Sequence, residues 1–278
     1  MNSRLISLDF FRGLTIAAMI VVNDPGSWSY VYPPLRHADW HGVTPTDLVF
    51  PFFLFIVGVS IVLALSKRNK KDSSIYFKII KRTIIIFSIG LFLALFPSFD
   101  FENLRIAGVL QRIALVYLFC SVIYLNSSFL VQFWIGIILL LLYWVFMTKI
   151  PFDNVLAGTL EPGNNFAAWV DQFITPGRMY QKTWDPEGFF STIPAIATGL
   201  SGMFCGHILL NKSEDLKDKI ILIFVAGFSA MCLGMLWDYS FPMNKHIWTS
   251  SYVLFSSGLA MLFLATCIWV IDLKKKTK

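Results

Sequence analysis

The chain has 278 residues, of which 56% are hydrophobic and only 14% are charged. Soluble globular domains carry about 25% charged residues, so this chain has too few charges to cover a water-facing surface. The net charge of +6 does not indicate a nucleic-acid partner, because the basic residues cluster in short segments between apolar runs, as membrane topology requires. The composition excludes a soluble protein and predicts an all-α bundle in a lipid bilayer.

Eight apolar runs are long enough to cross a bilayer, since a spanning helix needs about 20 mainly apolar residues. They cover residues 5–22, 46–65, 79–96, 106–125, 129–147, 189–210, 220–237 and 247–271. A basic residue precedes the first run, as in a signal peptide, but Asp9 and Arg12 interrupt it and no small-residue cleavage site follows. We therefore predict one polytopic domain over residues 1–278, with the first helix retained.

The distribution of lysine and arginine predicts the orientation of these helices. Residues 67–82, which join the second run to the third and include the start of the third, carry seven basic residues, so this connection is expected on the cytoplasmic side. In that orientation 15 basic residues are cytoplasmic and seven are on the other side, with Arg12 inside the first span. Both termini are then cytoplasmic, which agrees with an even number of spans.

Three segments rich in polar and aromatic residues fall on the extracytoplasmic side: 23–45, 148–188 and 238–246. Segment 148–188 has 41 residues, which is too long for an idle connection in a compact bundle. We expect it to form a lid or a substrate-binding surface within the same domain.

The small residues inside the apolar runs indicate packing rather than a metal or redox site. Gly202 and Gly206 form a GxxxG pattern, which favours close helix packing. The cysteines have no CxxC spacing and are expected to be buried as small hydrophobic residues, so no metal is predicted; they are Cys120, Cys205, Cys232 and Cys267.

Ionisable residues inside the spans cost about 2.5–3.5 kcal/mol each on insertion, and they are therefore candidates for function. Asp9 and Arg12 are three residues apart and share a helix face; a structural ion pair and a functional pair both fit. Gln111 and Arg112 lie about two turns into the fourth span, with Arg105 at its mouth. Arg112 could extend to the interface, but its polar neighbours favour a site facing the bundle interior.

Three polar residues near the extracytoplasmic ends of the first two spans each have two interpretations. Histidine can act as a base or nucleophile at neutral pH, yet His37 also suits an interfacial position beside Trp40. Asp47 can orient that histidine, or it can stabilise an ordinary helix start behind Thr44 as N-cap. Asn23 at the end of the first span can cap the helix or donate to a substrate oxygen.

These residues occur together in five blocks whose order and content resemble the heparan-α-glucosaminide N-acetyltransferase family and its bacterial relatives. The blocks span residues 4 to 253, so the resemblance covers most of the chain. They are Arg4-Leu5-x-Ser7-Leu8-Asp9-x-Phe11-Arg12-Gly13, His37-Ala38-x-Trp40-x-Gly42-x-Thr44-x-x-Asp47-Leu48-Val49-Phe50-Pro51, Arg105-Ile106-x-Gly108-Val109-Leu110-Gln111-Arg112, Asp185-Pro186-Glu187-Gly188 with Thr192, and Asn244-Lys245-x-x-Trp248-Thr249-x-Ser251-Tyr252-Val253.

The resemblance implies an enzyme that transfers an acetyl group from cytoplasmic acetyl-CoA to a glucosamine amine across the membrane. His37 matches the family's catalytic histidine, and Asn23 matches an asparagine at the end of its first span, with slightly different spacing between the two. Family members usually continue for several more helices, so this chain is expected to be short at its C-terminal end. The lumenal N-terminal domain of the animal enzymes is absent, as in bacterial relatives, which predicts a bacterial inner-membrane protein.

The expected roles follow from this resemblance and the topology. His37 would be the base or the acetyl acceptor, Asp47 would hold its ring, and Asn23 would stabilise the developing oxyanion. The donor is expected to be bound by Arg12, Gln111 and Arg112. The acceptor, a small amino sugar or glycan, is expected to contact Asp185, Glu187, Asn244, Lys245 and Trp248, with stacking on Trp184 or Trp248.

Two other interpretations stay open at this point. Buried charged residues also suit a glycan or amino-sugar carrier without acyl-transfer chemistry, although no inverted repeat, a transporter hallmark, is found. The second of these other interpretations is a catalytically inactive assembly partner. A homodimer is a candidate oligomeric state under every interpretation. Binding of acetyl-CoA and transfer of labelled acetyl to an amine would distinguish the enzyme from both.

Overall fold

Nine α-helices make up most of residues 5–68 and 72–275, which the computed structural model describes, and the all-α prediction is confirmed. They are α1 (Ile6–Asn23), α2 (Val49–Leu65), α3 (Ser74–Leu95), α4 (Val109–Asn126), α5 (Phe129–Lys149), α6 (Phe166–Ile174), α7 (Thr192–Leu210), α8 (Leu216–Asp238) and α9 (Ser250–Cys267). Five basic residues used in the topology prediction lie outside the described residues: Arg4, Lys70, Lys71, Lys276 and Lys278.

Short elements complete the connections between these helices. Three 3-10 segments lie between α1 and α2: η1 (Trp28–Tyr30), η2 (Pro33–Leu35) and η3 (Pro45–Leu48). A small antiparallel hairpin pairs β1 (Leu160–Glu161) with β2 (Asn164–Asn165) just before α6. Helix α9 continues into a π-helical turn, η4 (Ile268–Leu273).

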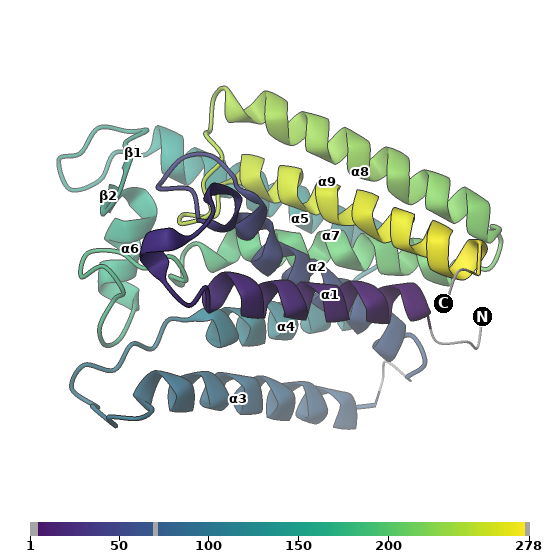
Figure 1. Ribbon diagram of the computed structural model, residues 1–278, viewed down its shortest axis with the longest axis horizontal. Coiled ribbons are helices and arrows are strands. Elements are labelled where there is room, and N and C mark those ends of the chain that lie inside the picture. Colours follow the sequence, from purple (N-terminus) through teal and green to yellow (C-terminus); the bar gives the residue numbers. More distant parts are fainter. Residues whose placement is uncertain (1–4, 69–71, 276–278) are drawn as a thin grey trace.

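Seven helices in the described part of the chain are long and apolar enough to cross a membrane: α1, α2 with η3, α4, α5, α7, α8, and α9 with η4. They match seven of the eight predicted spans to within a few residues. The remaining span, 79–96, falls in α3, which has 22 residues but carries Lys78, Lys81 and Arg82 in its first half. Helix α3 packs along α4 at the edge of the bundle (Figure 1), and its crossing of the bilayer stays a prediction.

Helix α7 is the centre of the bundle, and its glycines allow α2 to approach it closely. A Cβ atom on Gly202 would lie 2.0 Å from the carbonyl oxygen of Phe55, and one on Gly58 would lie 1.9 Å from that of Gly199. Gly206 faces Val62 in the same way, with 2.8 Å to its Cβ. The two backbones are therefore in contact, which confirms the packing interpretation of the GxxxG pattern.

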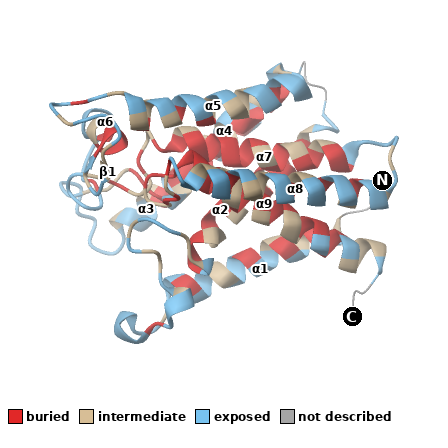
Figure 2. Cartoon of the chain, turned by 90° about the horizontal axis from the view of Figure 1, so that it is seen from above, coloured by how far each residue is buried: buried red, intermediate tan, exposed pale blue. Residues whose placement is uncertain are grey.

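The outer faces of the peripheral helices are apolar and exposed. Figure 2 shows buried residues through the centre of the bundle and exposed residues along α5 and α8. Large side chains such as Phe133, Leu142, Phe224 and Leu236 are exposed on these helices. In water such surfaces would be unfavourable, so they indicate the faces that contact lipid hydrocarbon.

The three predicted extracytoplasmic segments lie at one end of the bundle, opposite the end where α1 begins and η4 finishes (Figure 1). The long segment between α5 and α7 contains the hairpin and α6, and its Phe152 and Phe166 share a buried cluster with Phe241 of the α8–α9 connection. Asn165 caps α6 by accepting a hydrogen bond from the backbone of Ala168 at 2.9 Å. This segment is therefore an ordered cap over the bundle.

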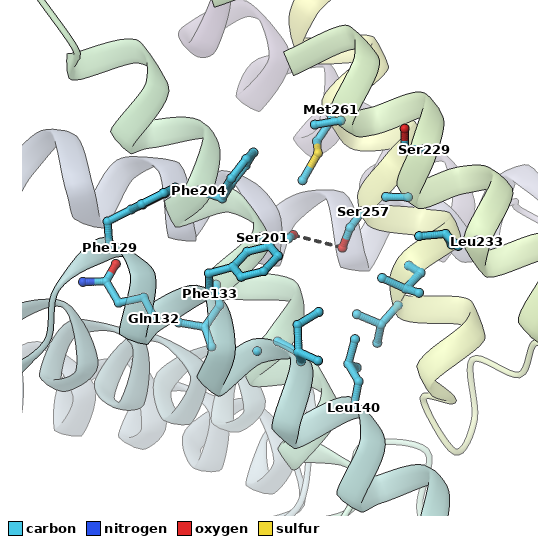
Figure 3. Close-up of a pocket in the computed structure, with 18 residues that line it drawn as sticks. Phe129, Gln132, Phe133, Leu140, Ser201, Phe204, Ser229, Leu233, Ser257 and Met261 are labelled. Carbon is cyan, nitrogen blue, oxygen red and sulfur yellow. Dashed lines mark hydrogen bonds between the residues drawn. The ribbon is translucent and has the colours of Figure 1, made fainter. Parts of the chain in front are cut away.

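A cavity of about 250 Å³ lies inside the membrane-spanning part, between α5, α7, α8 and α9 (Figure 3). Its walls are mainly apolar, with Phe133, Phe204 and Met261 among them. Its serines include Ser201 and Ser257, which hydrogen-bond to each other at 3.0 Å. At the cap end Ser250 donates to the Leu140 carbonyl at 2.8 Å, joining α9 to α5.

Candidate functional site

The polar end of the bundle contains a buried aspartate bonded to a half-exposed histidine. His37 Nδ1 lies 2.6 Å from Asp47 Oδ1, and the Asp47 side chain is 1% exposed against 36% for His37. A carboxylate on Nδ1 fixes the ring orientation and favours the tautomer with its lone pair on Nε2. The exposed ring nitrogen is then the one able to accept a proton or attack a carbonyl carbon.

Asp47 fills both of the roles that its sequence position allowed. It is the third residue of η3, and its Oδ2 accepts from the Thr44 backbone N–H at 2.9 Å, forming a capping box with Thr44. The same oxygen accepts from the Ala38 backbone N–H at 3.1 Å, while Oδ1 faces His37. The helix start therefore holds the carboxylate in place and ties the histidine loop to α2.

Lys245 is the third member of this cluster. Its Nζ lies 2.9 Å from His37 Nδ1, 3.3 Å from His37 Nε2 and 3.6 Å from Asp47 Oδ1. Burial lowers the pKa of Lys245 from the usual lysine value, although Asp47 and Glu187 act in the opposite direction. A lysine, a histidine and an aspartate from two distant parts of the chain thus form one contact network.

A tight turn before α9 delivers Lys245 to this position. The Asn244 side chain accepts from the Ile247 backbone N–H at 3.1 Å, and the Asn244 backbone N–H donates to Thr249 Oγ1 at 2.9 Å. Asn244 is completely buried. It was predicted as a sugar ligand, but the structure places it beneath the surface, where its hydrogen bonds shape the turn.

Three rings stand beside the cluster and are partly accessible. Trp40 stacks on His246 with ring centroids 5.3 Å apart, and Trp184 meets both rings edge-on at 5.0 and 5.4 Å. Burial lowers the pKa of His246 from the usual histidine value. Trp184, one of the two predicted stacking residues, is in a position to contact a sugar ring.

Trp248, the other predicted stacking residue, lies inside the bundle and is 1% exposed. Its ring packs edge-on against Phe50 and Tyr252, its Nε1 donates to Thr198 Oγ1 at 3.2 Å, and the Arg112 guanidinium lies 4.9 Å from its centroid. Stacking on a sugar from outside is excluded for this ring in the observed structure, because other side chains cover it.

The predicted acceptor residues Asp185 and Glu187 are held by Arg105. Arg105 Nε donates to Asp185 Oδ2 at 2.7 Å, and its Nη2 donates to both carboxylates. Burial alone would lower the pKa of Arg105, but the hydrogen bonds and charges of the carboxylates outweigh it and raise the pKa. The Asp185 side chain is fully buried and Glu187 is 11% exposed, so Glu187 is the carboxylate nearer the surface.

Arg112 lies buried in the first turn of α4. Its Nη2 donates to the Gly188 carbonyl at 2.9 Å and to Ser191 Oγ, while Nε and Nη1 have no hydrogen-bond partner among the described residues. The interpretation that Arg112 faces the interior is confirmed, and it does not extend to the interface. Gln111 is buried beside it and contacts the backbones of Gly90 and Gly108.

The remaining predicted residues lie apart from this cluster. Asn23 is the last residue of α1 and is exposed, and no hydrogen bond joins it to His37 among the described residues. Arg12 lies 11 residues earlier, about 16 Å along the helix. It bonds Asp9 at 3.3 Å, as the spacing predicted, and Ser60 of α2 at 2.9 Å. The three predicted donor ligands, Arg12, Gln111 and Arg112, are therefore not gathered in one place.

Sequence reasoning missed the contact between Lys245 and His37, and the hydrogen bond from the Tyr252 hydroxyl to the Asp47 carbonyl. Both join residues more than 200 positions apart, so no local spacing could have revealed them. The only signal was that the last recognised block contains Lys245 and Tyr252 close together.

Comparison with known proteins identifies the family. The family model described as heparan-alpha-glucosaminide N-acetyltransferase, catalytic, matches residues 4–227. The chain belongs to this family. It is 28% identical to the human heparan-alpha-glucosaminide N-acetyltransferase over 337 residues, an alignment that covers 98% of this chain and 49% of the relative. The mouse enzyme is 27% identical over 336 residues, with 98% and 50% covered.

The histidine cluster therefore lies in a member of a family of membrane acetyltransferases. The matched region includes His37, Asp47, Arg105 and Arg112, while Lys245 falls within the alignments to the two relatives, which cover nearly the whole chain. The chain spans about half the length of the curated relatives that it matches.

Proposed function

We propose that this chain is a membrane-bound N-acetyltransferase that moves an acetyl group from cytoplasmic acetyl-CoA to an amino sugar or glycan on the extracytoplasmic side. The observation that carries the proposal is the 2.6 Å contact between His37 and buried Asp47 at the end of the bundle where the polar segments gather. The relatives are named for acetyl transfer to the glucosaminide of heparan. An amine-bearing sugar is the corresponding acceptor class for this chain.

The chemistry assigned to His37 is general-base catalysis. Nε2 takes a proton as the acceptor amine attacks the thioester carbonyl, a C–N bond forms, and the C–S bond breaks. The departing thiolate of coenzyme A then takes this proton from Nε2, which returns His37 to its neutral form, and Asp47 stabilises the imidazolium between the two transfers. In the alternative covalent route Nε2 itself accepts the acetyl group before the amine does. The amide product and the free thiol are the same in both routes.

The donor must cross most of the bilayer to reach this site. The apolar core is about 30 Å thick, so the pantetheine arm would lie between helices while the nucleotide phosphates stay near cytoplasmic basic residues. Arg12 lies between the two ends of the bundle, and Arg112 and Gln111 lie at the end that contains His37. These predicted donor ligands would therefore contact different parts of the acetyl-CoA molecule. Asn23 is proposed as the oxyanion donor, which requires the end of α1 to close on His37 when substrates bind.

The acceptor is proposed to approach from the cap side. Trp184 and Trp40 offer ring faces or edges to a sugar, and Glu187 offers a partly exposed carboxylate to its hydroxyl groups. Asp185 supports Glu187 through their shared arginine. The proposed location is a bacterial inner membrane with both termini in the cytoplasm, and a homodimer is the proposed alternative to a monomer.

The test uses purified protein in liposomes that contain radiolabelled acetyl-CoA, with glucosamine added outside. Labelled N-acetylglucosamine should form outside, and His37→Ala should abolish it while coenzyme A binding persists. Trapping of label on wild-type protein, lost in His37→Ala, would select the covalent route. Uptake of glucosamine without acetylation would show a carrier and overturn the enzyme proposal; binding without either outcome would point to an inactive assembly partner.

A further inference from the structure

Lys245 occupies an unusual position for a lysine that was expected to bind substrate. Its Nζ is within hydrogen-bond distance of both ring nitrogens of His37, and its side chain is 14% exposed. The nearest carboxylate, Asp47, is already bonded to His37. A largely buried ammonium group beside an imidazole must affect the proton affinity of that ring.

The charges around His37 give the direction of that effect. Asp47 favours the imidazolium form, because an opposite charge within about 4–6 Å stabilises a cation. An imidazolium has no lone pair and cannot act as base or nucleophile. Lys245 Nζ lies 2.9 Å from Nδ1 and 3.3 Å from Nε2, so the positive charge of the ammonium is beside the ring and opposes a second positive charge on it.

The other charged and titratable groups near the pair do not replace Lys245 in this role. Glu187 lies on the cap and attracts Lys245 electrostatically, while Arg112 on α4 and His246 on the same turn interact with it or with His37 at longer range. Arg112 is directed toward Gly188 and Ser191, and His246 toward the Ala38 carbonyl at 3.2 Å. Lys245 is the cation in contact with His37 among the described residues.

We propose that Lys245 is a positioning residue that keeps the His37 ring neutral by balancing the charge of Asp47. The inference rests on the proposed function, since it gives a reason for the neutral ring. Lys245 Nζ contacts the ring and also lies 3.6 Å from Asp47 Oδ1, so one ammonium offsets the carboxylate charge that favours the imidazolium. The lysine thus prepares the base without taking part in bond formation.

The test measures the protonation of His37 without using acetyl transfer. Diethyl pyrocarbonate reacts with neutral imidazole, and mass spectrometry of peptides can follow His37 alone as the pH is varied. Lys245→Met and Lys245→Gln should raise the pH midpoint of this reaction, because the neighbouring positive charge is removed. Lys245→Arg, which keeps the charge, should restore a midpoint near that of the wild type.

Lys182→Met is the matched control, because Lys182 is exposed in the cap and should leave the midpoint unchanged. The acetyl-transfer rate, measured in parallel, should show its acidic limb displaced by the same amount in Lys245→Met. An unchanged midpoint in the folded Met or Gln variant, or an equal shift in Lys245→Arg, would overturn the role of the charge. A shifted midpoint in protein that transfers no acetyl would support the role and refute the proposed enzyme function.

Discussion

At the scale of single residues, the decisive side chain is His37. If it acts as base or acetyl acceptor, His37→Ala should remove acetyl transfer while leaving thermal stability and acetyl-CoA binding close to wild type. Turnover should fall by at least 10², the lower range for loss of general-base catalysis. The measurement is transfer to glucosamine by purified protein alongside a thermal melt.

A second substitution at the same position separates chemistry from packing. His37→Gln keeps a polar side chain that can still contact Asp47 and Lys245. Near-normal acetyl transfer by this variant would contradict the mechanism, because glutamine cannot accept the proton, and would leave His37 as an interfacial residue near Trp40.

Arg105 is expected to hold the cap to the bundle. Arg105→Ala leaves the Asp185 carboxylate buried without its cation, and loss of one partner from a buried ion pair typically costs about 3–5 kcal/mol. The thermal midpoint in detergent should fall clearly, and Arg105→Lys should recover part of the loss. Arg178→Ala is the control, because Arg178 is exposed and follows Gly177, which pairs with the Arg105 backbone. Equal falls of the thermal midpoint in both alanine variants would contradict the role of Arg105 in holding the cap to the bundle.

Asp171 gives a pH-dependent prediction. Burial raises its pKa to about 6, although the carboxylate accepts from the Phe190 backbone N–H at 2.9 Å. Because the folded pKa lies above the unfolded value, its contribution to stability is complete below about pH 4 and is lost as pH rises through about 6. The shift corresponds to about 3 kcal/mol. Asp171→Asn should flatten the change of thermal midpoint between pH 4.5 and 7; an unaltered profile would assign the change to other groups.

The sequence could identify His37 and Asp47 as site residues, because both occur in one short block with a helix start between them. It could not predict the burial or the contacts of residues whose neighbours come from distant segments of the chain. Trp248 is expected to stack on a sugar at the extracytoplasmic end of the last span, yet Phe50, Tyr252 and Arg112 cover it. Asn23 ends its helix as predicted, but its distance from His37 depends on the loop between them.

At the scale of helices, the contact between α2 and α7 depends on the absence of side chains. Gly202→Val should destabilise the protein strongly, since even a Cβ atom would overlap the Phe55 carbonyl and the two backbones would have to separate. Overpacking typically costs about 1–3 kcal/mol. The measurement is the thermal midpoint and the yield of monodisperse protein.

Gly13→Ala is the matched control for that experiment. Gly13 also lies within a spanning helix, but nothing is within 4 Å of a Cβ atom built on it. It should be neutral or slightly stabilising, because alanine favours helix more than glycine does. Similar losses at Gly13 and Gly202 would show a general intolerance of substitution rather than a close helix contact.

Helix positions were largely predictable because a run of about 20 apolar residues has few other structures in a membrane. The helix boundaries on the cap side were less predictable. Helix α4 begins at Val109 rather than at 106, since Arg105 pairs with the Gly177 backbone and Gly108 is extended. This places Gln111 and Arg112 in the first turn, not two turns into the helix. Helix α9 starts at Ser250 because the Asn244 turn occupies the residues before it.

At the scale of the whole molecule, the orientation in the membrane can be tested with cysteine labelling. A cysteine at Ser27 should react with an impermeant thiol reagent added to intact cells, whereas one at Ser213 should react only after the membrane is opened. Both positions are exposed, at opposite ends of the bundle. The prediction rests on the distribution of basic residues between the two sides.

Wild-type protein is the control for this labelling, because Cys120, Cys205 and Cys267 are buried and Cys232 is only partly exposed within α8. Reversed labelling of the two new cysteines would overturn the orientation and the proposed transfer of acetyl from inside to outside. Asp171 lies in segment 148–188, on the same predicted side as Ser27, but it would be an unsuitable labelling position because it is 2% exposed.

The contact between Lys245 and His37 also sets an order of events during synthesis of the chain. The two residues are 208 positions apart, and ribosomes add about 5–20 residues per second. A nascent chain therefore carries the aspartate–histidine pair for roughly 10–40 s before its lysine exists. Throughout that interval Asp47 lacks its cation, so incomplete chains differ from finished ones in local charge as well as in length.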